Sequence, residues 1–211
     1  MISVFKEDDK SHNEIYLLTI PLTITMVEIN AVLADAVCGH CGQVGTLQIY
    51  CEYVRSIIVI ENGKSEVLTL ALYRVKCTCN RTHVIAPGIQ MIPFSRYSLG
   101  FILLVLQAYI KREITVRAIA EKYIISVSTI YEWKKRFTTY YTLLKGVLEA
   151  KERSDSESVE DVLSDKQISS RLCNFIKDYG FGFMQRSMKN RRTPYIFVLM
   201  GFFITFARGS P

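Results

Sequence analysis

Two close pairs of cysteines constrain the fold of this chain more than any other feature. Residues 38–41 read Cys-Gly-His-Cys, and residues 77–79 read Cys-Thr-Cys. Between them, residues 46–60 and 66–76 are rich in Val, Ile, Leu and Tyr, and they are separated by a turn signal, Asn62-Gly63. Asn-Gly readily adopts the two positive φ angles of a tight turn, so the pattern predicts an antiparallel hairpin. A hairpin returns its two ends to one place, which would bring the two cysteine pairs together.

The compartment decides what paired cysteines are used for. The sequence starts MISVFKEDDK, with acidic residues where a secretory signal needs a basic start and an apolar stretch. We therefore expect a cytoplasmic protein whose thiols are reduced, and closely spaced reduced cysteines are more often metal ligands or catalytic thiols than disulfides. The apolar runs at 100–106 and 195–207 are shorter than the roughly 20 residues that cross a bilayer as a helix, so no membrane partner is expected.

The four paired cysteines have the chemistry of a zinc site. Zinc favours four soft ligands in a tetrahedron, and two tight turns can each supply two thiolates. The sequence predicts Cys38, Cys41, Cys77 and Cys79 as ligands of a structural Zn²⁺, because four protein ligands leave no open position for water. The second pair is one residue shorter than the usual spacing, so His83 is an alternative ligand in place of Cys77.

Two other readings of the cysteines stay open. A reactive Cys-x-x-Cys of a thiol redox enzyme needs a helix N-terminus to lower the thiolate pKa, whereas glycines and a strand pattern follow Cys41. Cysteines can also be buried as small apolar residues, which is what we expect of Cys51 and Cys173. His40 is expected to be a turn residue.

The whole chain divides by composition into four parts. Residues 1–93 are predicted to form a zinc-ribbon-like antiparallel β module, whose first 35 residues contribute one or two strands. Residues 94–150 follow as a helix-turn-helix domain, with helices expected at 98–112, 116–123 and 127–144. An acidic linker at 151–170 precedes a basic and then apolar C-terminal segment at 171–211, in which we expect a short helical region. The predicted fold class is α+β.

The stretch VRAIAEKYIISVSTIYEWKKRF, residues 116–137, has the apolar spacing of a helix-turn-helix. Ser126 is expected to cap the second helix. The turn carries Ile124, where a glycine is usual. The predicted inner positions are Ile119, Ala120 and Tyr123 on the first helix and Val127, Ile130 and Trp133 on the second.

The remaining positions of this motif predict how it would meet double-stranded DNA. The second helix of such a motif lies in the major groove with its N-terminal part against base edges, so we expect Ser128, Thr129 and Glu132 to contact bases. Cations further along the helix suit phosphates. The expected phosphate-binding residues are Lys134, Lys135 and Arg136, with additional contacts from Arg117 and Lys122. The net charge of +6 is too modest to decide the matter, and an ordinary helical hairpin with a solvated basic end is the alternative.

A resemblance supports this order of modules. The run YRVKCTCNRTHVIAP at 73–87, followed by PFSRYS at 93–98 and the helix-turn-helix pattern, resembles a bacterial family of uncharacterised, transposase-associated proteins that combine an N-terminal cysteine-rich zinc knuckle with a helix-turn-helix. The resemblance covers roughly residues 35–145. It implies DNA binding in a mobile-element context. In that family the second pair of cysteines tends to be Cys-x-x-Cys, whereas in this chain a single residue, Thr78, separates Cys77 from Cys79.

The sequence predicts no enzyme. A transposase core holds two metal ions with three carboxylates on a fold of more than about a hundred residues, whereas the acids that follow the helix-turn-helix crowd into the polar stretch 154–165. We expect a non-catalytic DNA-binding protein. The alternatives are a protein-interaction or assembly module, whose partner is a recombinase or a second copy of the chain, and a thiol redox enzyme.

Overall fold

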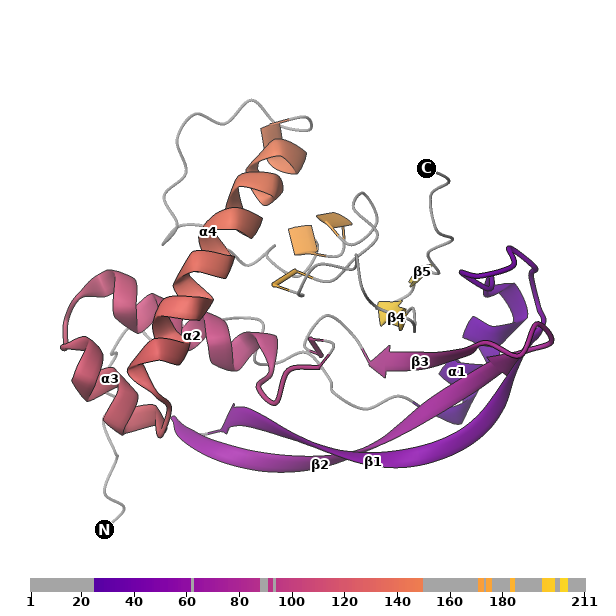
Figure 1. Ribbon diagram of the computed structural model, residues 1–211, viewed down its shortest axis with the longest axis horizontal. Coiled ribbons are helices and arrows are strands. Elements are labelled where there is room, and N and C mark those ends of the chain that lie inside the picture. Colours follow the sequence, from indigo (N-terminus) through magenta and orange to yellow (C-terminus); the bar gives the residue numbers. More distant parts are fainter. Residues whose placement is uncertain are drawn as a thin grey trace, which may run out of the picture.

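The computed structural model describes residues 25–61, 63–87, 91–92, 94–149, 171–172, 174–175, 183–184, 195–199 and 202–204. These residues form an α+β fold, as the sequence predicts (Figure 1). The acidic stretch 151–170 lies outside the described residues. The elements are α1 Met26–Asp35, β1 Leu47–Glu61, β2 Lys64–Cys77, β3 Thr82–Pro87, α2 Leu99–Lys111, α3 Val116–Tyr123, α4 Val127–Glu149, β4 Tyr195–Leu199 and β5 Phe202–Ile204.

The predicted hairpin is confirmed as β1 and β2. The two strands pair antiparallel from Leu47 opposite Cys77 to Glu61 opposite Lys64, with one irregularity, a bulge between Ile49 and Cys51. Gly63 in the connecting turn has a φ of 74°, a conformation that costs glycine little because it has no Cβ. The hairpin is long and curved, and in Figure 1 it runs from the helices at the left to the right-hand end of the molecule.

Further strands extend the sheet on one side only. The strand order is β1-β2-β3-β4-β5; β3 is antiparallel to β2, and β4 is parallel to β3. The apolar C-terminal run thus contributes strands β4 and β5 rather than only a helix. The parallel pairing of Val84 with Tyr195 joins positions more than a hundred residues apart in the sequence. On the other side of the sheet, β1 is the edge strand.

The prediction of strands before residue 35 is wrong for the described part of that segment, which forms α1. The helix starts at a capping box: Thr25 Oγ1 accepts a hydrogen bond from the N–H of Glu28, and the Glu28 carboxylate accepts one from the N–H of Thr25. Ile29 and Val32, three residues apart, then form one buried face. The β-branched residues of this stretch favoured a strand, but the cap and the apolar spacing favour a helix. Residues 1–24 lie outside the described residues.

The sheet has a separate hydrophobic core on each face. Successive residues of β3 alternate between them, as side chains of a strand must. Val84 and Ala86 pack into the larger core with helices α2, α3 and α4. Ile85 packs into the smaller core with α1. Figure 1 shows α1 at one end of the hairpin and α2, α3 and α4 at the other.

The helices are fastened directly to the hairpin. Ile58 of β1 donates its N–H to the carbonyl of Arg96 (2.7 Å) and accepts from the N–H of Ser98 (2.9 Å). Ser98 in turn caps α2 through its hydroxyl, which accepts from the N–H of Phe101. The larger core therefore runs without a break from the hairpin into the helices. The division of the chain at residue 93 stays a prediction.

Candidate metal centre and helix-turn-helix

Two tight turns at one end of the hairpin present the paired cysteines. In the first, Gly42 donates its N–H to the carbonyl of Cys38 (2.8 Å) and has a φ of 73°. In the second, between β2 and β3, the N–H of Asn80 bonds the carbonyl of Cys77 (2.9 Å). Because Leu47 pairs with Cys77 at this end of the sheet, the two turns face each other.

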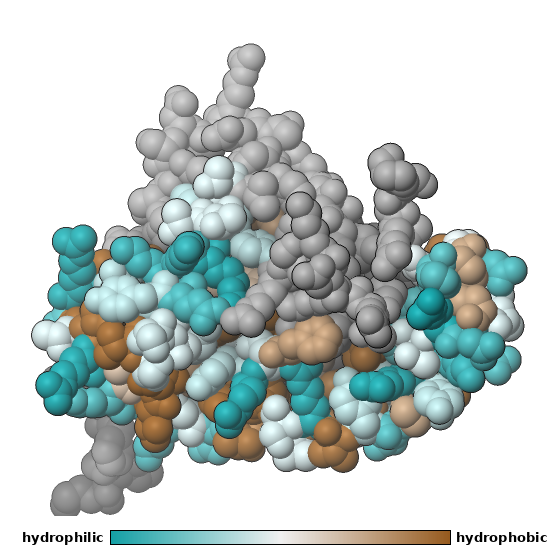
Figure 2. All heavy atoms as spheres, in the orientation of Figure 1, coloured by the Kyte–Doolittle hydropathy of each residue, from teal (hydrophilic) through white to brown (hydrophobic). Residues whose placement is uncertain are grey.

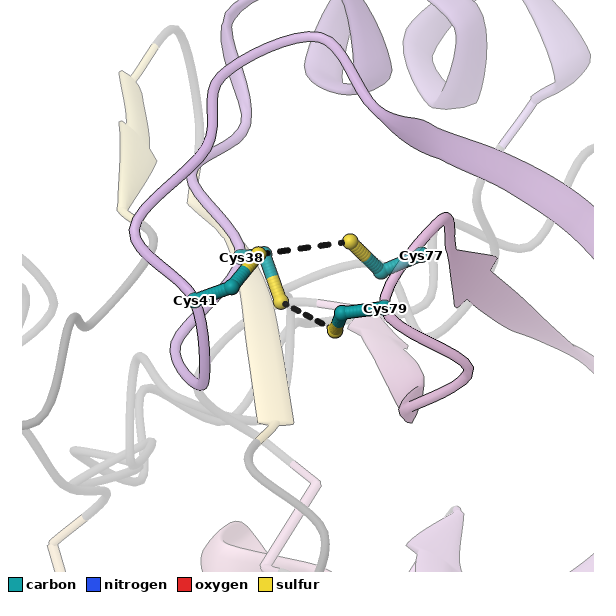
Figure 3. Close-up of side chains that lie close together, drawn as sticks. All are labelled: Cys38, Cys41, Cys77 and Cys79. Atoms are coloured by element: carbon teal, nitrogen blue, oxygen red, sulfur yellow. Dashed lines mark hydrogen bonds between the residues drawn. The ribbon is translucent and has the colours of Figure 1, made fainter.

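The four sulfur atoms gather around one point (Figure 3). All of them lie within 4.8 Å of one another, with Cys38 Sγ 3.7 Å from Cys79 Sγ and Cys41 Sγ 3.6 Å from Cys77 Sγ. A tetrahedron with zinc–sulfur bonds of about 2.3 Å has edges of about 3.8 Å, so the sulfur spacing fits a metal ion. It is far longer than the roughly 2.05 Å of a disulfide. The four thiols could therefore hold one metal ion.

His83 lies beside this cluster rather than in it. Its Nε2 is 3.3 Å from Cys38 Sγ, and the side chain is buried. The strand alternation that sends Val84 to the larger core turns His83 to the face of the cysteines. With four sulfurs already grouped, the ring is placed to donate an N–H to a thiolate, the role of a group that orients a ligand. The short Cys77-Thr-Cys79 spacing does not prevent both sulfurs from reaching the cluster.

The surroundings of the sulfurs affect how readily each thiol ionises. Burial opposes ionisation of Cys77, but hydrogen bonds from the Thr46 hydroxyl, 3.1 Å away, and from the backbone of Cys79 outweigh it and lower the pKa to about 6. A backbone hydrogen bond at Arg81 favours the thiolate of Cys79, yet burial and the neighbouring thiols raise its pKa to about 12. A backbone hydrogen bond from Gln43 favours the Cys41 thiolate, but burial and the thiols of Cys38 and Cys77 outweigh it and raise the pKa of Cys41. A cation must therefore displace protons to bind all four.

The cysteines lack the helix that a reactive Cys-x-x-Cys would use. Helix α1 ends at Asp35, before Cys38, and a turn and β1 follow. The prediction that Cys51 is buried is wrong: it is exposed on β1, next to the bulge, and it does not belong to the group of four cysteines. Cys173 lies outside the described residues.

Both helices of the helix-turn-helix begin at the residues that the sequence predicts. Thr115 caps α3, and the Ser126 hydroxyl caps α4 by accepting from the N–H of Thr129 (3.1 Å). Ile124 in the turn has a φ of 54°, the left-handed conformation that glycine adopts at such positions, although a β-branched side chain is strained there. The second helix continues to Glu149, beyond the predicted end at residue 144.

The inner positions of the motif are confirmed with one exception. Val127 is 37% exposed and lies at the surface, because the chain enters α4 there before the helix reaches the core. Phe137 extends the buried face in its place. The other predicted inner residues, Ile119, Ala120, Tyr123, Ile130 and Trp133, are buried.

Several residues predicted to contact DNA already have partners inside the chain. Arg136 pairs with Glu132 (2.5 Å), and only 18% of its side chain is exposed. It also donates to the carbonyl of Met184 (3.5 Å). Thr129 is half-buried, with its hydroxyl bonded to Ser126. Arg136 is therefore placed to join α4 to the C-terminal part of the chain.

The predicted cations at the edges of the motif are also engaged. Arg117 pairs with Glu121 (3.2 Å), and the ammonium of Lys122 lies over the ring of Tyr123. Lys134 donates to the hydroxyl of Tyr109 on α2 (3.1 Å). All three cations remain exposed to solvent.

One exposed side of α4 carries Ser128, Tyr131 and Lys135, spaced three and four residues apart on one face. The Lys135 ammonium makes no hydrogen bond or ion pair with any described residue. The Tyr131 ring meets the Tyr109 ring edge to face, at a centroid distance of 6.1 Å, and Tyr109 is held by Lys134. Tyr131 was not among the residues predicted to contact DNA; its position one turn before Lys135 was the available signal.

Comparison with known proteins supports the motif. Residues 103–140 match the family model described as a helix-turn-helix domain, which covers most of α2, all of α3 and the first part of α4. No curated protein and no solved structure matches the chain. None of the described helices is both long enough and apolar enough to cross a membrane. Residues 103–140 thus contain a helix-turn-helix element.

Proposed function

We propose that this protein is a non-catalytic, nucleoid-associated DNA-binding protein of the cytoplasm, with α4 in the major groove and a structural Zn²⁺ at the other end of the hairpin. The match to a helix-turn-helix domain supports the first part, and the spacing of the four sulfurs supports the second. The transposase-like or mobile-element context rests only on the family resemblance of roughly residues 35–145.

The observation that carries the proposal is the exposed side of α4. Tyr131 and Lys135 stand one turn apart with Ser128 nearer the helix start, as groove entry by the N-terminal part of the helix requires. The nearby acid, Glu132, is neutralised by Arg136 and so repels phosphates less. A serine hydroxyl can contact bases of either kind, and a lysine contributes affinity at phosphates.

This revises the roles of the predicted residues. Ser128 keeps its role at base edges, and Tyr131 joins it in place of the half-buried Thr129. Lys135 is the first candidate for a phosphate contact, with Lys134, Lys122 and Arg117 as exposed cations around it. Arg136 and Glu132 serve the fold of α4 instead.

Zinc is the metal that this ligand set favours. Four thiolates in a tetrahedron suit Zn²⁺ more than the hard cations, which select oxygen. The residues that would hold it are Cys38, Cys41, Cys77 and Cys79, and a bound zinc would supply crosslinking between the α1–β1 and β2–β3 turns. Such a crosslink stabilises an end of the sheet where the core is small.

The test is equilibrium binding of the full, zinc-loaded chain to mixed-sequence duplex DNA over a salt series. We expect the logarithm of the association constant to fall linearly with the logarithm of salt concentration, because bound cations release counterions from DNA. Absence of binding at low salt would contradict the proposal and favour an assembly module that captures a recombinase.

A further inference from the structure

The exposed edge of β1 is the feature that the proposed function leaves unused. Strand β1 is the edge of the sheet, and among the described residues only the segment around Tyr97 pairs with its free side, at Ile58. An uncovered edge strand presents backbone donors and acceptors to another strand. Of the nine residues from Gln48 to Ser56, only Arg55 carries a basic side chain, and no proline interrupts them.

The hydrogen bonds at Ile58 show which backbone groups point outward. Both its N–H and its carbonyl bond the Tyr97 segment, so they point away from β2. In an antiparallel ladder this direction alternates residue by residue, and the register is regular from Cys51 to Glu61. The N–H and carbonyl groups of Ser56, Val54 and Glu52 therefore also point outward.

We infer that β1 pairs antiparallel with β1 of a second copy of this chain, about a two-fold axis at Val54. In this register Val54 faces Val54 of the second copy, and Glu52 faces Ser56. All of these residues present outward backbone groups, as a hydrogen-bonded pairing requires. The intermolecular ladder ends at Ile58, because the backbone of Ile58 already pairs with the Tyr97 segment of its own copy. In this register Ile58 lies opposite residue 50 of the second copy, where β1 has its bulge.

The side chains at the axis are complementary in this register. The carboxylate of Glu52 meets the hydroxyl of Ser56 rather than a second carboxylate. On the other face Arg55 lies opposite Tyr53, but its guanidinium bonds the carbonyls of Ile92 and Ser95 in its own copy, so this pair adds no new contact. A register centred on Arg55 would instead place two guanidinium groups opposite each other. Val54 is 67% exposed, and Figure 2 shows apolar residues interspersed with hydrophilic ones along the rim formed by β1 and β2.

The dimer has a consequence for the position of the helices. In each copy the helix-turn-helix lies on the far side of Ile58 from Val54. A two-fold axis at Val54 therefore places the two motifs on opposite sides of the axis. The two Ile58 positions are eight residues apart along the paired strands, about 27 Å at about 3.4 Å per residue. That is the scale of the roughly 34 Å that separates two half-sites on DNA. The pairing itself does not depend on DNA binding.

Sedimentation of the full, zinc-loaded chain under reducing conditions tests the pairing. We expect a dimer that dissociates on dilution, and Val54→Pro should be a monomer with an unchanged circular dichroism spectrum, since the lost N–H points away from β2. Val67→Pro is the matched control, because Val67 is 66% exposed and its N–H also points away from the hairpin partner strand; it should remain dimeric. A wild-type monomer at all concentrations, or a dimeric Val54→Pro, overturns the inference.

A crosslinking variant keeps the test decisive where proline disturbs folding. Two residues in a hydrogen-bonded antiparallel pair have Cα atoms about 5.5 Å apart, within disulfide range. Val54→Cys should therefore give a disulfide-linked dimer on mild oxidation, with a peptide joined at position 54 to itself in mass spectrometry. Val67→Cys should give no such self-linked peptide at position 67. Equal linkage at both positions, or none at position 54, contradicts the register.

Discussion

The imidazole of His83 lies 3.3 Å from the sulfur of Cys38, within the buried end of the sheet. Strand β3 supplies the histidine, whereas the cysteine comes from the turn after α1, so the contact fixes the first cysteine turn against the sheet. His83 therefore has a role beside the four cysteines: it holds Cys38 in place, and it is not needed as a ligand itself.

Replacing His83 with alanine is expected to weaken metal retention without removing a ligand. Loss of an outer hydrogen bond typically lowers metal affinity by about 10–100-fold. Competition with a coloured chelator measures the change. His40→Ala is the control, because this histidine lies in the same cysteine turn but is exposed. Complete loss of binding on His83→Ala, with Cys77→Ser retaining normal affinity, would show instead that His83 is the fourth ligand.

Loss of a cysteine ligand is expected to destabilise the fold. Structural zinc sites contribute about 10 kcal/mol or more of binding free energy, so Cys41→Ser should lower the melting temperature strongly and abolish stoichiometric zinc. Cys51→Ser removes an equally exposed thiol outside the cluster and should change neither. Thermal melts and metal analysis measure the melting temperature and the zinc content of both variants. Equal melting temperatures, or a wild-type melt unaffected by strong chelators, would be incompatible with a structural metal.

Metal uptake is expected to release protons at pH 7. The pKa of Cys79 is raised to about 12 and that of Cys41 is also raised, so both thiols keep their protons until a cation displaces them. Cys77, with a pKa of about 6, is already ionised in large part. Protons therefore compete with the metal, and affinity falls as the pH falls. Zinc titration in weak buffer with a pH indicator checks this, and uptake without proton release would refute it.

The turn of the helix-turn-helix is expected to gain stability from glycine. Ile124 has a φ of 54° and is 85% exposed, so its side chain contributes strain and little packing. Ile124→Gly should raise the free energy of unfolding by about 1 kcal/mol, the order of the cost of the left-handed conformation. Ile114→Gly is the control, as a partly exposed isoleucine without positive φ, and it should not be stabilising. Urea denaturation measures both; a destabilised Ile124→Gly contradicts the strain.

The sequence could predict the parts of the fold that local signals specify. Asn62-Gly63 marked the hairpin turn, and Ser126 with the spacing of Ile130 and Trp133 marked the second helix of the motif. Helix α1 also had a local signal, since Thr25 and Glu28 form a capping box, but the β-branched composition of the same stretch favoured strands. Composition was therefore the weaker guide at that position.

What the sequence could not supply depends on contacts between distant segments. The pairing of β3 with β4 joins residues more than a hundred positions apart, and no local pattern encodes it. The same holds for Arg136, whose contact with the carbonyl of Met184 removes it from the exposed face. The ring of Tyr131 meets the ring of Tyr109, which lies on another helix. These contacts changed the set of candidate DNA-binding residues.

The most direct test of DNA recognition by α4 compares Lys135→Ala with Arg81→Ala in the salt dependence of duplex binding. Both variants lose one exposed positive charge, but Arg81 lies in the cysteine turn at the other end of the hairpin. Lys135→Ala should weaken binding to all sequences and reduce the salt slope by about 1, whereas Arg81→Ala should leave both the affinity and the slope unchanged. Equal effects of the two substitutions, or no effect of Lys135→Ala, would contradict a DNA interface on α4.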